Sequence, residues 1–380
     1  ANKNPSFLIL IAAIIKKSRM SAMTTEKLVP ESEVTRLVIE CMRWAGADST
    51  HAARLAEILL SADRRGHYSH GINRLDVYVR DVRAGVTQGS GEPAILKETA
   101  GTAHVDGRHL LGVVVGEFCM DLAVAKARQC GVGWVVAANS THFGIAGHYS
   151  LRAAGHGLIG LAFTNASPIL VPTRAKQPAL GTNPVCMAAP TDRPGEPFLL
   201  DMATSAVAYG KVEMKHRTGQ QLPAGWAVDS EGRETRDSEA GLHGGVLPLG
   251  GLEETSGYKG YGLALMVEIL CSLLAGTPVG PSVRAWKSDT APARLGQCFV
   301  AVDPSAFAPD FSGRLSEVAD VFRGLEPADP DSPVLFPGDP ERAREADCAR
   351  RGGVAYHVNQ LAHLAALAQE CSVEPMRTVD

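Results

Sequence analysis

Three polar side chains with complementary chemistry follow one another at a spacing of four in the stretch RRGHYSHGINRLDVYVRDVRAG. If a helix starts just after Ser69, then His70, Arg74 and Tyr78 fall within about 80° of one another, at about 100° per residue. Arg74 can hold a carboxylate through paired hydrogen bonds, Tyr78 can bond an adjacent oxygen, and His70 can exchange a proton near neutral pH. This stripe therefore suits a small carboxylic acid, and a solvated helix face is the alternative.

Metal binding by His67 and His70 is the weaker reading of the same stretch, because no carboxylate or further histidine stands at a supporting spacing. A second acid/base candidate is His142 in NSTHFGIAGHYS, which follows a predicted strand and precedes a predicted helix. His148 lies within that helix and is expected to be structural or exposed.

Two further segments could receive the phosphates or ribose of a ligand. In LLDMATSAVAYGK, Asp201 stands at a strand end, and Thr204 and Ser205 are expected to cap a helix whose free N–H groups could bind an anion. Lys259, in GYKGYGLALMVEIL, precedes a buried helix and could contact a phosphate. Simple capping and a tight turn are the respective alternatives.

The elements that must position these residues change in character along the chain. Apolar spacing predicts helices over 30–45, 49–65 and from 70 to about 85, with Ser49 as the cap of the second. Beyond residue 95, strands are predicted at GVVVG, GWVVAA, LIGLAFT, VCMAAP, FLLDMA and CFVAV, with helices over 117–129, 145–154, 205–217 and 261–275. Residues 219–257 predict loops and a hairpin around Trp226, and the last part returns to helix, with a start at Asp339 and Pro340. Strands and helices do not alternate regularly, so a fully parallel sheet is not required.

GHGLIG, residues 155–160, has the glycine spacing of the dinucleotide-binding fingerprint but the wrong surroundings. The fingerprint works where a strand ends and a helix begins, because the pyrophosphate must lie at the helix N-terminus. Here a helix precedes the glycines and a strand follows them. We therefore expect Gly155 and Gly157 to end a helix and form a turn.

Composition limits the classes of partner and compartment. With 380 residues, 45% hydrophobic and a formal charge of −4, the chain suits a globular protein of two domains and lacks the basic stripe of a nucleic-acid binder. Eight scattered cysteines without a CxxC pair predict buried thiols in a reducing, cytoplasmic setting and no metal site. The apolar run FLILIAAII is too short to cross a bilayer, which needs about 20 residues, so residues 1–22 are interpreted as a leader or added segment, with a targeting segment as the alternative.

Taken in order, RGHYSHGINRLDVY, NSTHFGIAGHYS, TNASP, LGTNPVCMAAP, LDMATSAVAYGKV, GYKGYGLALMVEIL and LFPGDPERA resemble the malate/L-lactate dehydrogenase family, over about residues 25–370. The resemblance implies an α/β fold that binds a nicotinamide dinucleotide in a non-Rossmann, mixed-sheet domain, beside a helical domain built from both chain ends. The expected divisions are a helical part at 23–95, the α/β dinucleotide-binding domain at 96–305 and a second helical part at 306–380. It also implies a homodimer whose active site lies close to the subunit interface.

The resemblance assigns roles to the residues that match its motifs. His70 and His142 match the two histidines assigned as acid/base in different members, Arg74 the arginine that binds the substrate carboxylate, and Tyr78 the tyrosine one turn further. Ser69 would orient its neighbour or contact the cofactor. The segments that match cofactor-binding positions contain His142, Phe143, Gly144, Asn183, Asp201, Met202, Ala203, Thr204, Lys259, Gly338 and Asp339.

The activity expected from this resemblance is hydride transfer between NAD or NADP and C2 of a small 2-hydroxy acid, of malate or L-lactate type. Arg74 would fix the carboxylate while His70, slightly favoured over His142, or His142 itself takes the hydroxyl proton. Reduction of a cyclic ketimine on the same scaffold is the alternative, although some ketimine reductases carry an acidic residue where this chain has Lys211. A catalytically silent nucleotide-binding dimer is the second alternative. Arg217 could meet the 2′-phosphate of NADP, and no membrane or nucleic-acid partner is expected.

Overall fold

A computed structural model describes residues 26–286 and 288–379, which form two compact units. One unit contains the described residues up to Gly85, Ala189–Leu199 and Phe307 onward, and the other contains Val86–Ala188 and Leu200–Ala306. The predicted division after residue 95 fell later than the first of these boundaries, and the sequence did not indicate the transfer of Ala189–Leu199. The leader predicted at 1–22 lies outside the described residues.

The first unit is helical and is built from both ends of the chain, as predicted. Its helices are α2 (Glu31–Ala45), α3 (Ser49–Arg64), α4 (Leu75–Arg83), α10 (Phe311–Arg323), α11 (Asp339–Arg351) and α12 (Val358–Glu370). α2 ends at Gly46, whose φ of 112° requires glycine. α3 is capped by Asp48, which accepts the N–H of His51, and not by Ser49 as predicted.

A short pair of strands joins the early and late parts of this unit. β1 (Glu26–Val29) pairs antiparallel with β12 (Val354–His357), and α11 and α12 flank β12 in the chain. Neither strand was predicted, because each is a short run whose partner lies in a distant part of the sequence. The pairing ties β12, near the end of the chain, to the part of the same unit that contains α2 and α3.

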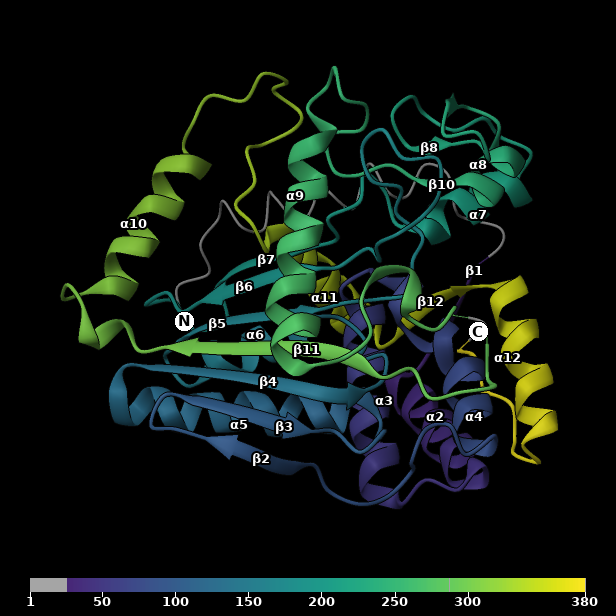
Figure 1. Ribbon diagram of the computed structural model, residues 1–380, viewed down its shortest axis with the longest axis horizontal. Coiled ribbons are helices and arrows are strands. Elements are labelled where there is room, and N and C mark those ends of the chain that lie inside the picture. Colours follow the sequence, from purple (N-terminus) through teal and green to yellow (C-terminus); the bar gives the residue numbers. More distant parts are fainter. Residues whose placement is uncertain (1–25, 287, 380) are drawn as a thin grey trace. The chain divides into compact units, whose positions relative to one another are not determined.

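The second unit is a layered α/β structure around one mixed sheet (Figure 1). Its strand order is β2 (Ala94–Glu98), β3 (Thr102–Asp106), β4 (Val132–Ser140), β11 (Leu295–Val302), β5 (Ile159–Thr164), β6 (Val185–Ala189) and β7 (Phe198–Met202). β3 and β4 are parallel, whereas β11 runs antiparallel to both β4 and β5. This mixed centre is not the parallel sheet of a Rossmann domain.

Helices cover both faces of the sheet. The residues of β11 show this, since alternate side chains of a strand point to opposite faces. Cys298 and Val300 pack with α9 (Gly257–Glu268) and the π-helical segment Ile269–Leu273 that extends it. Phe299 instead contacts the ring of Tyr149 on α6 (Gly147–Gly155), on the side where α5 (Gly112–Cys130) also packs. The central strands are consequently buried on both faces.

Three further predictions of local structure were wrong. GVVVG is not a strand but the first part of α5, since a short apolar run does not distinguish a buried strand from a buried helix. The helix predicted over 205–217 begins at Tyr209, as α7 (Tyr209–Arg217). The helix predicted from residue 70 begins only at Leu75, after two 3-10 turns, Tyr68–His70 and Ile72–Arg74.

Other predictions were confirmed. In GHGLIG, α6 ends at Gly155, Gly157 has a φ of 78°, and β5 begins at Ile159, so the glycines form a helix end and a turn. The long 219–257 segment contains a small sheet of β8 (Ala227–Val228), β9 (Glu234–Thr235) and β10 (Gly245–Val246), with α8 (Ser238–Gly244) between the last two. The β8–β9 hairpin directly follows Trp226.

No helix within the described ranges has the length and apolar character needed to cross a bilayer.

Candidate active site

Ser69, His70 and Arg74 are brought together by the two 3-10 turns that precede α4. The Ser69 hydroxyl hydrogen-bonds Nδ1 of His70 at 2.9 Å, and the Ser69 carbonyl accepts Nε of Arg74 at 2.6 Å. All three residues are half-buried. One serine therefore orients both the imidazole and the guanidinium, through its side chain and its backbone.

The environment of His70 favours the neutral imidazole. Burial, followed by the positive charges of Arg74 and His67, lowers the pKa of His70 from 6.5 to about 4. At neutral pH the ring can therefore accept a proton. Its hydrogen bond through Nδ1 makes Nε2 the nitrogen suited to exchange a proton with a ligand.

Tyr78 does not lie on a polar stripe with His70, and that prediction was wrong. A single helical rise from residue 70 was assumed, but His70 is in a 3-10 turn and Arg74 is the residue that precedes α4. Tyr78 is on α4 and its side chain is only 5% exposed, among the core residues of that helix. Its position one turn after Arg74 is retained.

His142 lies in the other unit, just after the end of β4, and its surroundings are well ordered by contacts. Its ring packs edge-on against Trp286, with centroids 4.7 Å apart, and its Nδ1 accepts the N–H of Gly144 at 3.4 Å. Phe143 stacks on Tyr149 at 4.8 Å, and the Tyr149 hydroxyl donates to the Phe143 carbonyl at 2.5 Å. Gly144 has a φ of 76°, which the turn requires.

Asp201 is tied to the same segment, and His148 is part of its support. Oδ2 of Asp201, on β7, accepts the N–H of Gly147 at the start of α6 at 2.7 Å. His148 pairs with the buried Glu117 of α5, Nε2 to Oε1 at 3.0 Å, which agrees with the structural role expected for it. Asp201 is consequently held beside the loop that carries His142.

Thr204 and Ser205 do not cap a helix, so the capping predicted for them was wrong. The Thr204 hydroxyl donates to the carbonyls of Thr182 and Asn183 at 3.0 Å, and Ser205 donates to the carbonyl of Val207. α7 starts after Ala208, which has no capping side chain. Thr204 instead joins the end of β7 to the loop before β6.

Asn183 lies at the centre of a buried polar network. Its Oδ1 accepts the N–H of Ala166, and its Nδ2 donates to the carbonyl of Ala264 and to Oε1 of Glu268, at 3.0 and 3.3 Å. Ser272 donates to the other oxygen of Glu268 at 2.8 Å. The network joins the TNASP, LGTNP and GYKGYGLALMVEIL segments, and Glu268 is fully buried.

The remaining cofactor candidates lie on β7, α9 and the turn before α11. Met202 and Ala203 follow Asp201 and are half-buried, and Lys259 is exposed near the start of α9, with its ammonium 6.0 Å from the ring centre of Tyr258. Gly338 precedes α11 with a φ of 100°. The Pro337 carbonyl accepts the N–H of Leu199, which joins this turn to the start of β7.

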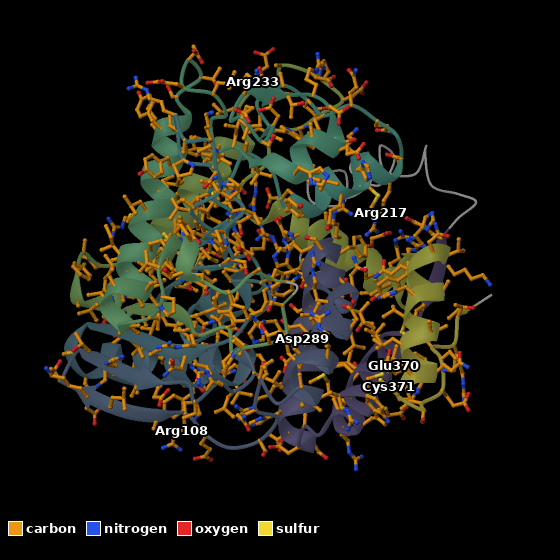
Figure 2. The ribbon with its side chains drawn as sticks, turned by 45° about the vertical axis from the view of Figure 1, so that its right-hand side comes forward. Arg108, Arg217, Arg233, Asp289, Glu370 and Cys371 are labelled. Carbon is orange, nitrogen blue, oxygen red and sulfur yellow. The ribbon has the colours of Figure 1, made fainter. Side chains whose placement is uncertain are left out.

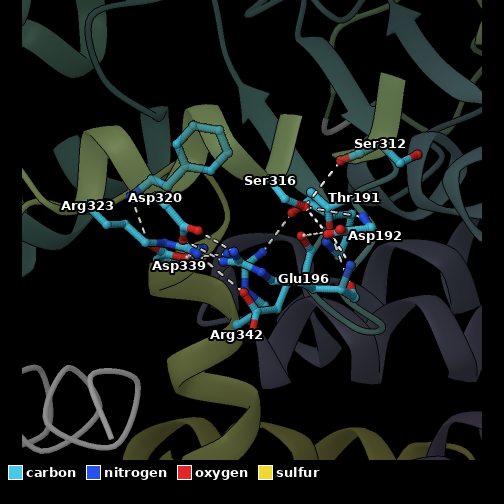
Figure 3. Close-up of polar contacts among 12 residues, drawn as sticks. Thr191, Asp192, Glu196, Ser312, Ser316, Asp320, Arg323, Asp339 and Arg342 are labelled. Carbon is cyan, nitrogen blue, oxygen red and sulfur yellow. Dashed lines mark hydrogen bonds and ion pairs between the residues drawn. The ribbon is translucent and has the colours of Figure 1, made fainter. Parts of the chain in front are cut away.

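Asp339 is the centre of a buried ion-pair network (Figure 3). Its carboxylate accepts Nε and Nη2 of Arg323 at 3.0 and 2.7 Å, Nη2 of Arg342, and the N–H of Phe336 at 2.8 Å. Burial opposes ionisation, yet these donors hold the pKa of Asp339 below its usual 3.8. Both carboxylate oxygens are thus used within the unit.

Sequence reasoning missed Trp286 and Glu268. Glu268 could have been found from its place in the apolar run LALMVEILCSLL, where a lone carboxylate in a buried helix needs internal donors. Trp286 lies in an irregular segment and its sequence neighbours give no such signal. Within the described ranges, no three His, Cys, Asp or Glu side chains gather as a metal site would require.

Comparison with known proteins finds similarity to dehydrogenases and reductases. The family model for malate/L-lactate dehydrogenase matches residues 29–365. The chain is 41% identical over 294 residues to a malate dehydrogenase of Pyrococcus abyssi, covering 76% of this chain and 80% of that protein. It is 32% identical over 338 residues to a delta-1-pyrroline-2-carboxylate reductase of Ancylobacter novellus, covering 88% and 96%. The solved malate dehydrogenase of Pyrococcus horikoshii superposes with a TM-score of 0.85 at 33% identity, covering 92% of this chain and 97% of that one.

Proposed function

Because the chain belongs to the malate/L-lactate dehydrogenase family, we propose that it transfers a hydride between a nicotinamide cofactor and C2 of a small 2-hydroxy acid or its 2-oxo acid. The observation that carries the proposal is the joint orientation of His70 and Arg74 by Ser69. A cation and a neutral imidazole held on two successive 3-10 turns are what a carboxylate with an adjacent hydroxyl requires.

In the oxidation direction, Arg74 binds the substrate carboxylate and Nε2 of His70 takes the hydroxyl proton as the hydride leaves C2. In the reverse direction the same proton returns to the carbonyl oxygen. Tyr78 contributes one turn further along, either to the carboxylate or to the position of Arg74. His142 is the second candidate for the acid/base, and its Nδ1 already accepts from Gly144.

The bound cofactor would supply the hydride acceptor or donor. The residues of the α/β unit fit such a group by their chemistry, because the ring of His142 and the ammonium of Lys259 offer donors to a polar anionic ligand, while the N–H of Gly144 holds the His142 ring. Asp201 and Met202 end β7 and Ala203 follows them, and Asp201 accepts the N–H of Gly147, just after the loop that carries His142. Asn183 and Thr204 would act through the backbone they hold, since their side chains are fully buried with internal partners.

Gly338 and Asp339 would likewise contribute through the turn and its backbone, because the Asp339 carboxylate is engaged by two arginines. The choice between NAD and NADP is a separate proposal. Arg217, exposed at the end of α7 beside Lys215 and His216, is available to meet a 2′-phosphate (Figure 2). We therefore propose NADP as an accepted cofactor, tested by comparing KM for the two reduced nicotinamides in Arg217→Ala.

Reduction of a cyclic ketimine is the second candidate, favoured by the likeness to the Ancylobacter reductase. Against it stands the exposed Lys211 on α7, where some ketimine reductases carry an acidic residue. A catalytically silent nucleotide-binding dimer is the third. The oriented His70 and Arg74 pair argues against it, because a merely structural turn has no use for that pairing.

A homodimer is proposed for the assembled enzyme. The exposed side of α9 and its π-helical extension carries Tyr258, Leu265, Met266, Ile269 and Leu273, an apolar surface that a second copy would cover. Sedimentation of the purified protein tests this, and a monomer at all concentrations would contradict it.

The activity is tested by following oxidation of NADH and of NADPH with oxaloacetate, pyruvate and pyrroline-2-carboxylate in parallel. Turnover of a 2-oxo acid that collapses in His70→Ala or His142→Ala supports the dehydrogenase and identifies the acid/base. Turnover of the imine alone moves the proposal to the ketimine reductase. Nicotinamide binding without turnover of any of the three favours the silent dimer.

A further inference from the structure

A fully buried carboxylate lies directly behind the turn that carries His70 and Arg74, and the proposed chemistry does not use it. Asp63, in the last turn of α3, is 0% exposed. Its Oδ2 accepts the N–H of Ile72 at 3.0 Å and the hydroxyl of Tyr356 at 2.7 Å. Ile72 begins the second 3-10 turn, and Tyr356 lies on β12.

The backbone of the turn rests on this carboxylate without an intervening side chain. A Cβ placed on Gly71 would lie 1.7 Å from Oδ1 of Asp63, so no other residue fits there without displacing the aspartate. Oδ1 has no hydrogen-bond partner among the described residues. A buried carboxylate with two neutral donors and one unsatisfied oxygen is unfavourable for stability, which calls for a compensating role.

We propose that Asp63 is a positioning residue of the active site: it fixes the backbone at Gly71 and Ile72, and so sets the relation between His70 and Arg74, while Tyr356 holds Asp63 in place. This inference rests on the proposed function of that turn. His70 ends the first 3-10 turn and Arg74 ends the second, with Gly71 and Ile72 between them. A shift of the Ile72 amide therefore changes the position of the guanidinium relative to the imidazole.

The arrangement around Asp63 is rigid on its other side as well. The Tyr356 ring packs edge-on against Tyr68, with centroids 6.2 Å apart, and Tyr68 begins the first 3-10 turn. β12 is in turn paired with β1. The Asp63 carboxylate thus connects three separate segments within the helical unit, namely α3, the two 3-10 turns of residues 68–74, and β12.

The experiment compares Asp63→Asn, Asp63→Ala and Tyr356→Phe in the full chain, with Ser316→Ala as the control. Asparagine keeps an acceptor for Ile72 and Tyr356, so its KM for the 2-oxo acid should stay within about threefold of the original. Alanine removes both bonds and should lower kcat/KM by about 10- to 100-fold, mostly through KM for the 2-oxo acid, with KM for the reduced nicotinamide unchanged. The kcat/KM of Tyr356→Phe should lie between the values for Asp63→Asn and Asp63→Ala. Ser316 is buried in the same unit but bonds Asp192, so its loss should not change KM for either substrate.

A second readout does not depend on turnover and separates this inference from the proposed function. Amide hydrogen exchange in a peptide covering residues 68–78 should accelerate in Asp63→Ala and Tyr356→Phe and stay slow in Asp63→Asn. If the unsubstituted protein turns over no substrate, the proposed function fails. Amide hydrogen exchange still tests whether Asp63 and Tyr356 hold the backbone at Gly71 and Ile72. Unchanged exchange and unchanged KM in Tyr356→Phe, together with equal effects of Asn and Ala at position 63, would overturn the inference, even if Asp63→Ala does not fold.

Discussion

The carbonyl of Ser69 accepts a hydrogen bond from Nε of Arg74 at 2.6 Å. This bond uses the Nε–H, which a carboxylate bound to the two terminal nitrogens does not need. It also fixes the plane of the guanidinium, so less side-chain entropy is lost when a ligand binds.

Replacing Arg74 with lysine should therefore raise KM for the 2-oxo acid by at least about tenfold. A point charge loses both the paired geometry and the bond to Ser69. Steady-state kinetics with the 2-oxo acid varied measure the change. Arg80→Lys, on α4, is the control and should leave KM unaltered, and an unaltered KM in Arg74→Lys would remove Arg74 from substrate binding.

The pH dependence of oxidation should report His70. Its pKa is lowered to about 4, so kcat/KM for the hydroxy acid should have no acid limb attributable to this group until the pH falls toward 4, where the ring becomes protonated and ceases to be a base. A bound carboxylate neutralises Arg74, one of the causes of the shift, so the acid limb of kcat should lie at higher pH than that of kcat/KM. Equal limbs in the two profiles would argue for His142 as the base.

Stability should depend on pH through Asp63. Burial raises the pKa of Asp63 from 3.8 to about 7, so the folded state retains a proton that the unfolded chain releases. The contribution is fully present below pH 4 and is lost as pH rises to 7, by a few kcal/mol at about 1.4 kcal/mol per pKa unit. Tyr356 and Tyr68 are the titratable side chains that face it from β12 and the first turn, and both stay neutral in this range.

Urea unfolding at pH 5 and pH 8 measures this term. The free energy of unfolding of Asp63→Asn should gain on that of the original protein as the pH rises, because the amide does not titrate. The pKa of His70 is shifted in the opposite direction, downward. Because both proteins contain His70, its contribution cancels in the difference between their free energies of unfolding. A difference independent of pH would mean that Asp63 is already ionised at pH 5.

Loss of the Asp339 carboxylate should destabilise the protein by about 3–5 kcal/mol, since Asp339→Asn leaves Arg323 and Arg342 without their shared anion in a buried position. Asp320→Asn is the matched control. Asp320 pairs with Arg193 at the surface, and its side chain is 55% exposed, so its loss should cost no more than about 1 kcal/mol. Similar losses in the two variants would show that burial does not strengthen the Asp339 network.

The glycines of GHGLIG should be dispensable for cofactor binding. A Cβ on Gly155 meets nothing within 4 Å, so Gly155→Ala should fold normally and keep KM for the reduced nicotinamide. In a Rossmann fingerprint the first glycine makes the tight turn, so the corresponding change would distort the loop that receives the pyrophosphate. A rise in KM of tenfold or more in this variant would place the cofactor at this turn.

Sequence alone predicted most of the elements whose residues are local and periodic, such as α2, α11 and β4. It failed where a second segment decides the structure. The turns at 68–74 interrupt the helical pattern because Asp63 and Tyr356 hold the backbone there, and Thr204 is drawn away from capping by the carbonyls of Thr182 and Asn183. Asp63 carries a signal that could have been used, since it continues the buried face of α3 marked by Ile58, Leu59 and Ala62.

The hydrogen bond between Asp63 and Tyr356 spans 293 residues of sequence, which sets a timetable for synthesis on the ribosome. At about 5–20 residues per second, roughly 15–60 s separate translation of the two residues. Throughout that interval residues 68–74 have been synthesised but lack the contact between Asp63 and Tyr356, and β1 lacks its partner strand. Residues 68–74 therefore reach their final packing only after β12 has been synthesised, and a chain truncated before Tyr356 would lack the hydrogen bond to Asp63.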